Sequence, residues 1–229
     1  DPANAKLTAK AGVACLAGSD TLQIHAGTYD EVLSFDEGVR FPSGTAIAHT
    51  VIQAYSTDVV TIKATTTSIG HVVTLDGDAY VEFKNLILNG NLVLNVGIQQ
   101  QGASHHNVYR NIEVKNTLNI GINFTQYDLS SDGNNLIVDS TIHDIGTFCG
   151  GQASNCSAIY LQTNDNIVEH TETYNISGTG PNARHGNRTI LRYNTSHNNV
   201  EGFSSSGGSM KPAAVIHDII VHKNLPTYS

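Results

Sequence analysis

The sequence contains no tryptophan, a single methionine and few charged side chains, and these shortages exclude several classes of protein. Charged residues make up 14% of the 229 residues, and the formal net charge is −8 at pH 7. No basic cluster accompanies this acidic balance, so nucleic acid is not expected as a partner. No apolar run reaches the ~18 residues that a membrane helix requires, so no membrane span is expected.

Cysteine is also scarce, with three residues in the chain. Cys15 follows small apolar residues and is expected to be a buried free thiol. Cys149 and Cys156 flank a loop of glycine and small polar residues, and we expect a local disulfide between them, which suits an oxidising compartment. The protein is therefore expected to be secreted or exposed at a cell surface. No second pair of cysteine or histidine ligands accompanies these cysteines, so zinc is not expected.

Asparagine, by contrast, recurs at one place in a series of short strand-like segments. Residues 81–89, 108–114 and 190–198 each contain a strand, a one- or two-residue corner with Asn, and a second strand. The aligned corners are Asn85, Asn111, Ser140, Thr171 and Asn194, with spacings of 26, 29, 31 and 23 residues. A variable period in this range is typical of a solenoid whose coils differ in loop length. Histidines at several of these corners are expected to join the same ladders.

The corner asparagines have a physical explanation. A sharp bend between two strands requires a backbone near the left-handed region, which Asn tolerates better than most residues. This pattern resembles the right-handed parallel β-helix of the pectate-lyase-like superfamily over roughly residues 20–224. The resemblance implies an all-β, single-stranded, three-sheet solenoid. Residues 3–17 are rich in Ala, Lys and Leu, so we expect residues 1–18 to form a capping helix and residues 19–229 the β-helix.

Each later coil is expected to contain a third strand after a longer loop, at residues 97–101, 121–125, 158–162, 183–187 and 202–205. Alternation of side chains then assigns the two faces. The inward side chains are Ile98, Ile122, Phe124, Ile159, Leu161 and Phe203. The outward side chains are Gln99, Gln101, Asn123, Thr125, Tyr160, Gln162 and Arg184. Amides and hydroxyls suit sugar hydroxyls, although a plain solvated sheet face explains them equally well.

The sharpest local motif is Arg-His-Gly-Asn, which begins at Arg184. It is similar to a segment of the alginate lyase and chondroitinase B family of polysaccharide lyases. The similarity implies that Arg184 contacts a uronate during β-elimination and that His185 supports it. The lysine of that family falls near Gln162 or Thr163 here and is absent, so Tyr160 and His170 are the alternative candidate bases nearby. Lys211 could reach the same face from a loop.

Carboxylates permit other chemistry. Asp128 and Asp132 lie in a predicted loop after Thr125, where acid pairs could serve a glycoside hydrolase. Together with Asn134 they could also bind Ca²⁺ as a cofactor, through oxygen ligands. The same residues are also ordinary turn formers.

The sequence therefore favours a carbohydrate-active β-helix, most like a lyase that cleaves an acidic polysaccharide. The proposed catalytic residues are Arg184, His185 and Tyr160, and Gln99, Gln101, Asn123, Thr125, Gln162 and Lys211 would bind substrate. The alternatives are a non-catalytic carbohydrate-binding or structural module and a glycoside hydrolase. Few residues follow the last coil, so we expect a longer chain or self-association through Ile216, Ile219, Ile220 and Val221.

Overall fold

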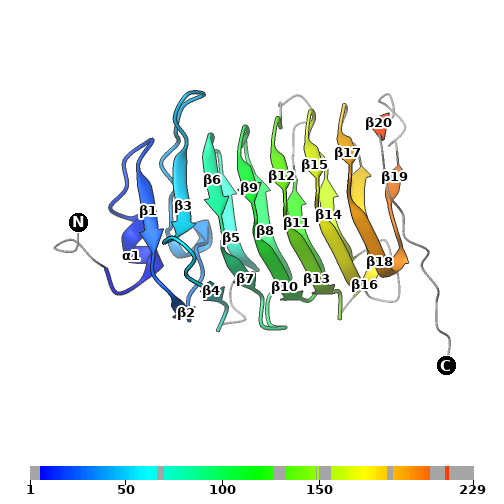
Figure 1. Cartoon of the computed structure of the whole chain (residues 1–229), viewed down its shortest axis with the longest axis horizontal. Helices are drawn as coiled ribbons and strands as arrows, with labels where there is room; N and C mark the ends of the chain where they lie inside the picture. The colour runs from blue at the N-terminus through cyan, green and yellow to red at the C-terminus, as the bar shows by residue number, and fades with distance from the viewer. Residues whose placement is uncertain are drawn as a thin grey trace.

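The left-handed corners expected from the sequence are present in a computed structural model of the chain, which has the fold of a parallel β-helix (Figure 1). The structure describes residues 6–65, 70–125, 133–147, 149, 156–184, 188–206 and 215–216. Parallel strands stack side by side along one axis, and one short helix lies at the N-terminal end. The predicted fold class is therefore confirmed.

The first face of the solenoid is an eight-stranded parallel sheet. Its strands, in spatial order, are β1 (Thr21–Ile24), β3 (Thr50–Ala54), β6 (Val81–Lys84), β9 (Val108–Arg110), β12 (Leu136–Val138), β15 (Ile167–Glu169), β17 (Ile190–Arg192) and β20 (Val215–Ile216). Each coil of the solenoid contributes one strand to this sheet. Strands that are neighbours in the sheet lie far apart in the sequence, because a full turn of the solenoid separates them.

The other two faces are joined into one twelve-stranded sheet by β16 (Glu172–Arg184), which bends from the second face into the third. The second face contains β2 (Gly27–Tyr29), β4 (Val60–Lys63), β7 (Ile87–Asn89), β10 (Glu113–Thr117), β13 (Thr141–Ile145), the first half of β16, and β18 (Thr195–Glu201). The third face contains β5 (His71–Asp76), β8 (Val96–Gln101), β11 (Ile120–Phe124), β14 (Ser157–Leu161), the second half of β16, and β19 (Ser204–Ser206).

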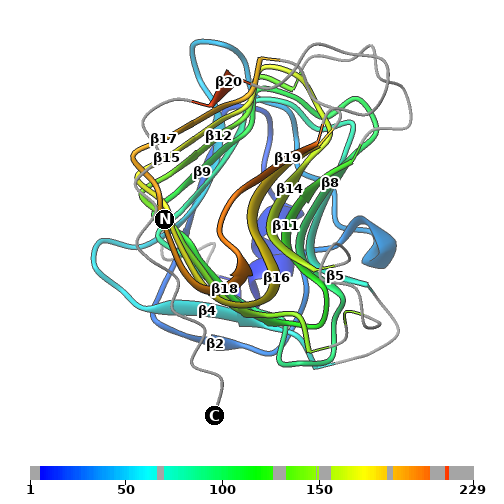
Figure 2. The same ribbon diagram turned by 90° about the vertical axis from the view of Figure 1, so that its right-hand side faces the viewer.

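The solenoid is right-handed. Figure 2 looks along the axis from the C-terminal end, and the chain runs anticlockwise from β17 through β18 to β19 as it advances toward the viewer. The observed hand agrees with the rule for crossovers between parallel strands.

Residues with left-handed backbone make the corners between faces. Between the first and second faces they are Asn85, Asn111, Asp139, His170 and Tyr193. Ser140, Thr171 and Asn194, which the sequence aligned with the first two, instead come one residue later and are buried. The alignment was wrong there because Asp, His and Tyr occupy the bend itself, while the polar residue behind it hydrogen-bonds inside the coil.

A ladder of buried asparagines lies at another corner, where the third face turns into the first. The amide oxygen of Asn107 accepts a hydrogen bond from the N–H of Val81 at 2.9 Å. The amide oxygen of Asn135 accepts a hydrogen bond from the backbone N–H of Asn107 at 3.0 Å. The amide oxygen of Asn166 accepts one from the side-chain amide of Asn135 at 3.0 Å. The side chains thus satisfy backbone and amide groups of the neighbouring coil in the interior, where an unpaired polar group is costly.

The core contains a row of aromatic rings. Phe41 meets Phe83 edge to face with centroids 5.1 Å apart, Phe83 stacks on Tyr109 at 5.8 Å, and Tyr109 lies 5.5 Å from Phe124. The predicted inward residues of β8, β11 and β14 are buried as expected, and Phe203 packs partly buried against the core.

The N-terminal cap is shorter than the sequence predicted, because helix α1 covers Ala9–Val13 alone. Thr8 caps its start, and the chain leaves the helix at Ala14. Gly12 faces β1 so closely that an added Cβ would lie 2.7 Å from a methyl carbon of Leu22. So short a helix depends on this packing rather than on helix propensity.

Two cysteine predictions have different outcomes. A disulfide joins Cys149 to Cys156, the pair that the sequence singled out. Cys15 is a free thiol, but it is exposed rather than buried, so that part of the prediction was wrong. It lies just after α1 ends, where the side chain is outside the packed face of the helix.

The described part of the chain contains no helix with the length and hydropathy needed to cross a bilayer. At the C-terminal end the structure describes β20, and Ile219, Ile220 and Val221 lie outside the described residues. The expected contact of that end therefore stays a prediction.

Phe124→Ala should lower the free energy of unfolding by ~3–5 kcal/mol, because it removes a fully buried ring from the aromatic row. Urea denaturation followed by circular dichroism measures this change. The exposed Val200→Ala is the control and should change stability by less than about 0.5 kcal/mol. Equal effects of the two substitutions would contradict the assigned core.

Candidate functional site

The strands of the third face, among them β5, β8, β11 and β14, are stacked in Figure 2. The outward side of this face carries two columns of polar side chains, each formed by residues in register on neighbouring coils. The first column is Thr74, Gln99, Asn123, Tyr160, Asn182 and Ser204. The second is Asp76, Gln101, Thr125, Gln162 and Arg184. Alternation along each strand places both columns outward, while the residues between them point into the core.

The structure therefore brings together seven of the residues that the sequence predicted for the site. They are Gln99, Gln101, Asn123, Thr125, Tyr160, Gln162 and Arg184. His185, Lys211, Asp128 and Asp132 lie outside the described residues, and their roles stay predictions. The sequence did not predict Asn182 as a site residue. Gly180 and Pro181 are unusual inside a strand, so the strand was expected at residues 183–187, whereas β16 already includes Asn182.

The middle of the first column is not a solvated surface. Gln99 is 5% exposed and Asn123 is 8% exposed. The amide nitrogen of Asn123 donates to the amide oxygen of Gln99 at 2.9 Å, and the Gln99 amide donates to the hydroxyl of Thr125. These bonds fix the three side chains in one orientation across two coils.

Tyr160 interrupts this amide ladder. It pairs in register with Asn123 on one side and Asn182 on the other, but its hydroxyl, at the far end of a rigid ring, donates to neither amide oxygen. The amide oxygens of Asn123 and Asn182 are buried and have no hydrogen-bond partner among the described residues. An unsatisfied buried acceptor costs about 1–3 kcal/mol, and such a local cost is typical of a functional site.

Arg184 is a half-buried cation in the second column, and Ser206 pairs with it in the register of the next coil. It makes no ion pair with any described residue, whereas Arg110 and Arg192 pair with Glu82 and Glu169 at 3.0 and 2.6 Å. Both paired arginines lie on the first face. A guanidinium without a carboxylate on a polar, outward face is suited to bind an anion from solution.

The N-terminal end of the same face is acidic, which the sequence did not reveal. Asp78 is 9% exposed, and its carboxylate accepts the N–H of Asp76 at 3.1 Å. Burial raises the pKa of Asp78 to about 6, against the opposing effects of the Asp76 N–H and the Arg40 guanidinium. An Asp-Gly-Asp turn directly after β5 is the signal that could have drawn attention to these residues.

Histidines stack on tyrosines along the second face, away from these columns. His143 and His197 lie against opposite sides of Tyr174, with centroids 4.7 and 5.2 Å away. The two ring nitrogens of His143 lie 3.1 Å from Glu113 and 2.7 Å from Asp144. Burial alone would raise the pKa of Glu113, but hydrogen bonds from Lys115 and His143 outweigh it and lower the pKa. Of the predicted corner histidines, His106 and His170 do occupy corners.

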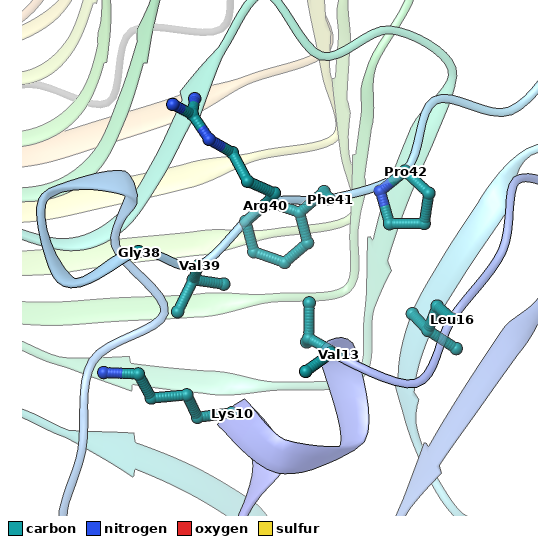
Figure 3. A pocket seen from close by; sticks show the side chains of 9 residues that line it. Lys10, Val13, Leu16, Gly38, Val39, Arg40, Phe41 and Pro42 are labelled. Carbon is teal, nitrogen blue, oxygen red and sulfur yellow. The ribbon is translucent and has the colours of Figure 1, made fainter.

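A pocket of about 390 Å³ lies at the capped N-terminal end, between α1 and the segment 38–42 (Figure 3). Val13, Leu16, Val39 and Phe41 give it an apolar lining, and Lys10 at its rim is paired with Glu37 at 2.6 Å. Its apolar lining suits sugar hydroxyls less well than the amide columns do. Among the described residues, no group of three His, Cys, Asp or Glu side chains could hold a metal ion.

Two solved structures that share the fold are a pectate lyase and an alginate lyase. Pectate lyase Pel9A superimposes with a TM-score of 0.67 and 14% sequence identity, over 91% of this chain and 55% of that one. An alginate lyase from Paenibacillus sp. str. FPU-7 superimposes with a TM-score of 0.52 and 13% identity, over 82% of this chain and 73% of that one. The chain thus spans about half the length of Pel9A. At these identities the likeness concerns the fold.

No protein-family model matches the sequence, and a search of curated proteins found no match. The function must therefore be inferred from the side chains of the third face.

Asp78→Asn should raise the free energy of unfolding at pH 7 by about 1–2 kcal/mol after allowance for solvent screening. The folded-state pKa of about 6 exceeds the unfolded value, so the folded chain binds this proton more tightly. Stability from this group is full below about pH 4 and falls as the pH rises through 6. Urea unfolding between pH 4 and 8 measures the effect. The exposed Asp30→Asn is the control, and a parallel pH profile for both variants would contradict the assignment.

Tyr160→Asn should raise the free energy of unfolding by about 1 kcal/mol, because the new amide can donate to the unpaired oxygen of Asn123. Thermal and urea denaturation measure this gain. Tyr174→Asn is the matched control, and it should destabilise the protein because it removes a ring stacked between two histidines. Destabilisation by Tyr160→Asn as large as that of the control would show that Tyr160 serves the fold.

Proposed function

We propose that this protein is a carbohydrate-active β-helix that cleaves an acidic polysaccharide by β-elimination. The observation that carries the proposal is the half-buried guanidinium of Arg184, which has no ion pair with a described residue and faces outward beside Tyr160. The lyases that share the fold support the same class of reaction.

The proposed reaction needs a cation and a base near one sugar unit. Arg184 binds the uronate carboxylate and neutralises the charge that develops on it when the adjacent carbon loses its proton. The electrons of the broken C–H bond form a carbon–carbon double bond, and the bond to the leaving sugar oxygen breaks. That oxygen then takes up a proton, so atoms and charge balance.

Tyr160 is the proposed proton carrier. It lies one coil before Arg184 and two residues back along the strand register, because Tyr160 pairs with Asn182. With a coil spacing of about 4.8 Å and a rise of about 3.3 Å per residue, the two Cα atoms are about 8 Å apart. One sugar unit fits between two side chains that converge across this separation, with its carboxylate at Arg184 and its acidic C–H toward Tyr160.

Several further roles belong to the proposal. His185 would support Arg184, Lys211 would bind substrate from its loop, and Gln99, Gln101, Asn123, Thr125 and Gln162 would hydrogen-bond sugar hydroxyls. Asp128 and Asp132 would bind Ca²⁺ if a cation is used. Secretion or display at a cell surface fits an extracellular polymer and the Cys149–Cys156 disulfide.

A non-catalytic carbohydrate-binding module is the second candidate. The hydrogen-bonded amides of Gln99 and Asn123 favour it, because they form a fixed recognition surface that needs no base. This candidate predicts sugar binding without a change in the polymer.

Arg184→Ala should abolish formation of unsaturated uronate while leaving the melting temperature nearly unchanged, because the side chain has no ion pair with a described residue to lose. Arg184→Lys should fail as well, since an ammonium cannot make the bidentate contact with a carboxylate. Ultraviolet absorbance over a panel of uronate polymers, with and without Ca²⁺, measures the activity.

Arg192→Ala is the matched control, because Arg192 pairs with Glu169 on the first face and should not affect cleavage. Binding of polymers without cleavage would favour the binding module. A fall in melting temperature with Arg184→Ala larger than with Arg192→Ala would show that Arg184 is structural.

A further inference from the structure

Two buried amide oxygens on the third face have no hydrogen-bond partner in the part of the chain that the structure describes, and they lie on either side of Tyr160. Asn123 is 8% exposed and Asn182 is 4% exposed, and no described residue donates a hydrogen bond to either side-chain oxygen. Both belong to the same outward column, one coil before and one coil after Tyr160. Their separation is therefore about two coil spacings, or roughly 10 Å.

The amide N–H donors of Asn123 and Gln99 are already in hydrogen bonds, whereas the amide oxygen of Asn123 has no donor among the described residues. The amide nitrogen of Asn123 already donates to Gln99, and the amide nitrogen of Gln99 donates to Thr125. Asn123 is therefore held with its oxygen directed away from Gln99, toward the Tyr160 side. A ligand that approaches this oxygen, or that of Asn182, must supply hydrogen-bond donors.

A carboxylate is unsuited to these positions. A carboxylate offers acceptors alone when ionised, so it would be repelled by an amide oxygen and would leave that oxygen unsatisfied. A sugar hydroxyl can donate, and the acceptors then gain the hydrogen bond that the unliganded protein lacks. Farther toward the N-terminal end of the face, the carboxylates of Asp76 and Asp78 would also repel a negatively charged ligand.

Arg184 lies two residues beyond Asn182 on the same strand, and its positive charge favours a negatively charged group. The face thus combines one position for an anion with neighbouring positions for hydroxyl donors. Both oxygens are closed from solvent in the unliganded chain. Tyr160 lies between them in the register of the sheet.

We propose that the column of Asn123, Tyr160 and Asn182 is a subsite for an uncharged, hydroxyl-bearing sugar next to the uronate at Arg184. The substrate class is then a mixed polysaccharide, in which neutral sugars adjoin the uronate, rather than a polymer of uronates alone. This inference rests on the proposed function for the role of Arg184. The two positions lie in neighbouring columns of the face, because Asn182 and Arg184 are two residues apart on one strand.

Titration calorimetry with oligosaccharides of matched length tests the subsite. The mixed probes are fragments of gellan, glucuronoxylan and rhamnogalacturonan, and the uniform probes are fragments of polygalacturonate and alginate. We expect at least one mixed probe to bind the unaltered protein tenfold or more tightly than either uniform probe. Asn182→Leu should weaken that mixed probe about tenfold and leave uniform probes unchanged, while Asn182→Asp should weaken all of them.

The control is Gln53→Leu, which removes an amide from β3 on the first face and should change no affinity. Asn182→Leu should fold normally because the side-chain oxygen of Asn182 has no hydrogen bond to a described residue to lose, and the melting temperature of the variant checks this. Preference for a uniform probe, no binding of any mixed probe, or indifference to Asn182→Leu would overturn the subsite.

The same samples separate this inference from the proposed function. Release of unsaturated uronate from uniform polymers, together with no binding of any mixed probe, would refute the subsite and support the lyase. Tight binding of a mixed probe that depends on Asn182, with no cleavage of any polymer, would support the subsite and refute the lyase.

Discussion

The left-handed backbone at the corners is the constraint on which the rest of this structure depends. A parallel coil closes only if the chain turns sharply between faces, and residues such as Asn85, Asn111, Asn116 and Asn175 adopt positive φ at these turns. Asn adopts this conformation at a lower energetic cost than most residues do. Because each turn lies above the preceding one, the strands between them keep their register, and side chains of the same face form columns.

Stacking of the coils lets polar side chains of the same column hydrogen-bond with one another. In the interior, Asn107, Asn135 and Asn166 pass hydrogen bonds from coil to coil, so their burial costs little. On the outward third face the same chemistry begins with Gln99 and Asn123 and then stops at Tyr160. The contrast between a complete ladder and an interrupted one gives Tyr160 its significance, since nothing in the fold requires a phenol there.

Charge is distributed to match this arrangement. The chain carries a net charge of −8, which by itself repels acidic polymers. Arg110 and Arg192 are neutralised by Glu82 and Glu169 on the first face. Arg184 has no such pair among the described residues, so the positive charge needed to receive an anion is concentrated at one end of the third face. The acidic Asp76 and Asp78 lie at the other end.

The sequence by itself determined the fold class, the approximate coil period and the two faces of β8, β11 and β14. These features are local, because alternation and tolerance of positive φ act within a few residues. The tertiary structure decided which residues become neighbours across coils. It moved three corners by one residue, exposed Cys15, shortened the cap to Ala9–Val13 and revealed Asn182 beside Tyr160. Such neighbours lie a full coil apart in the chain, and their register depends on loop lengths and packing that no local pattern records.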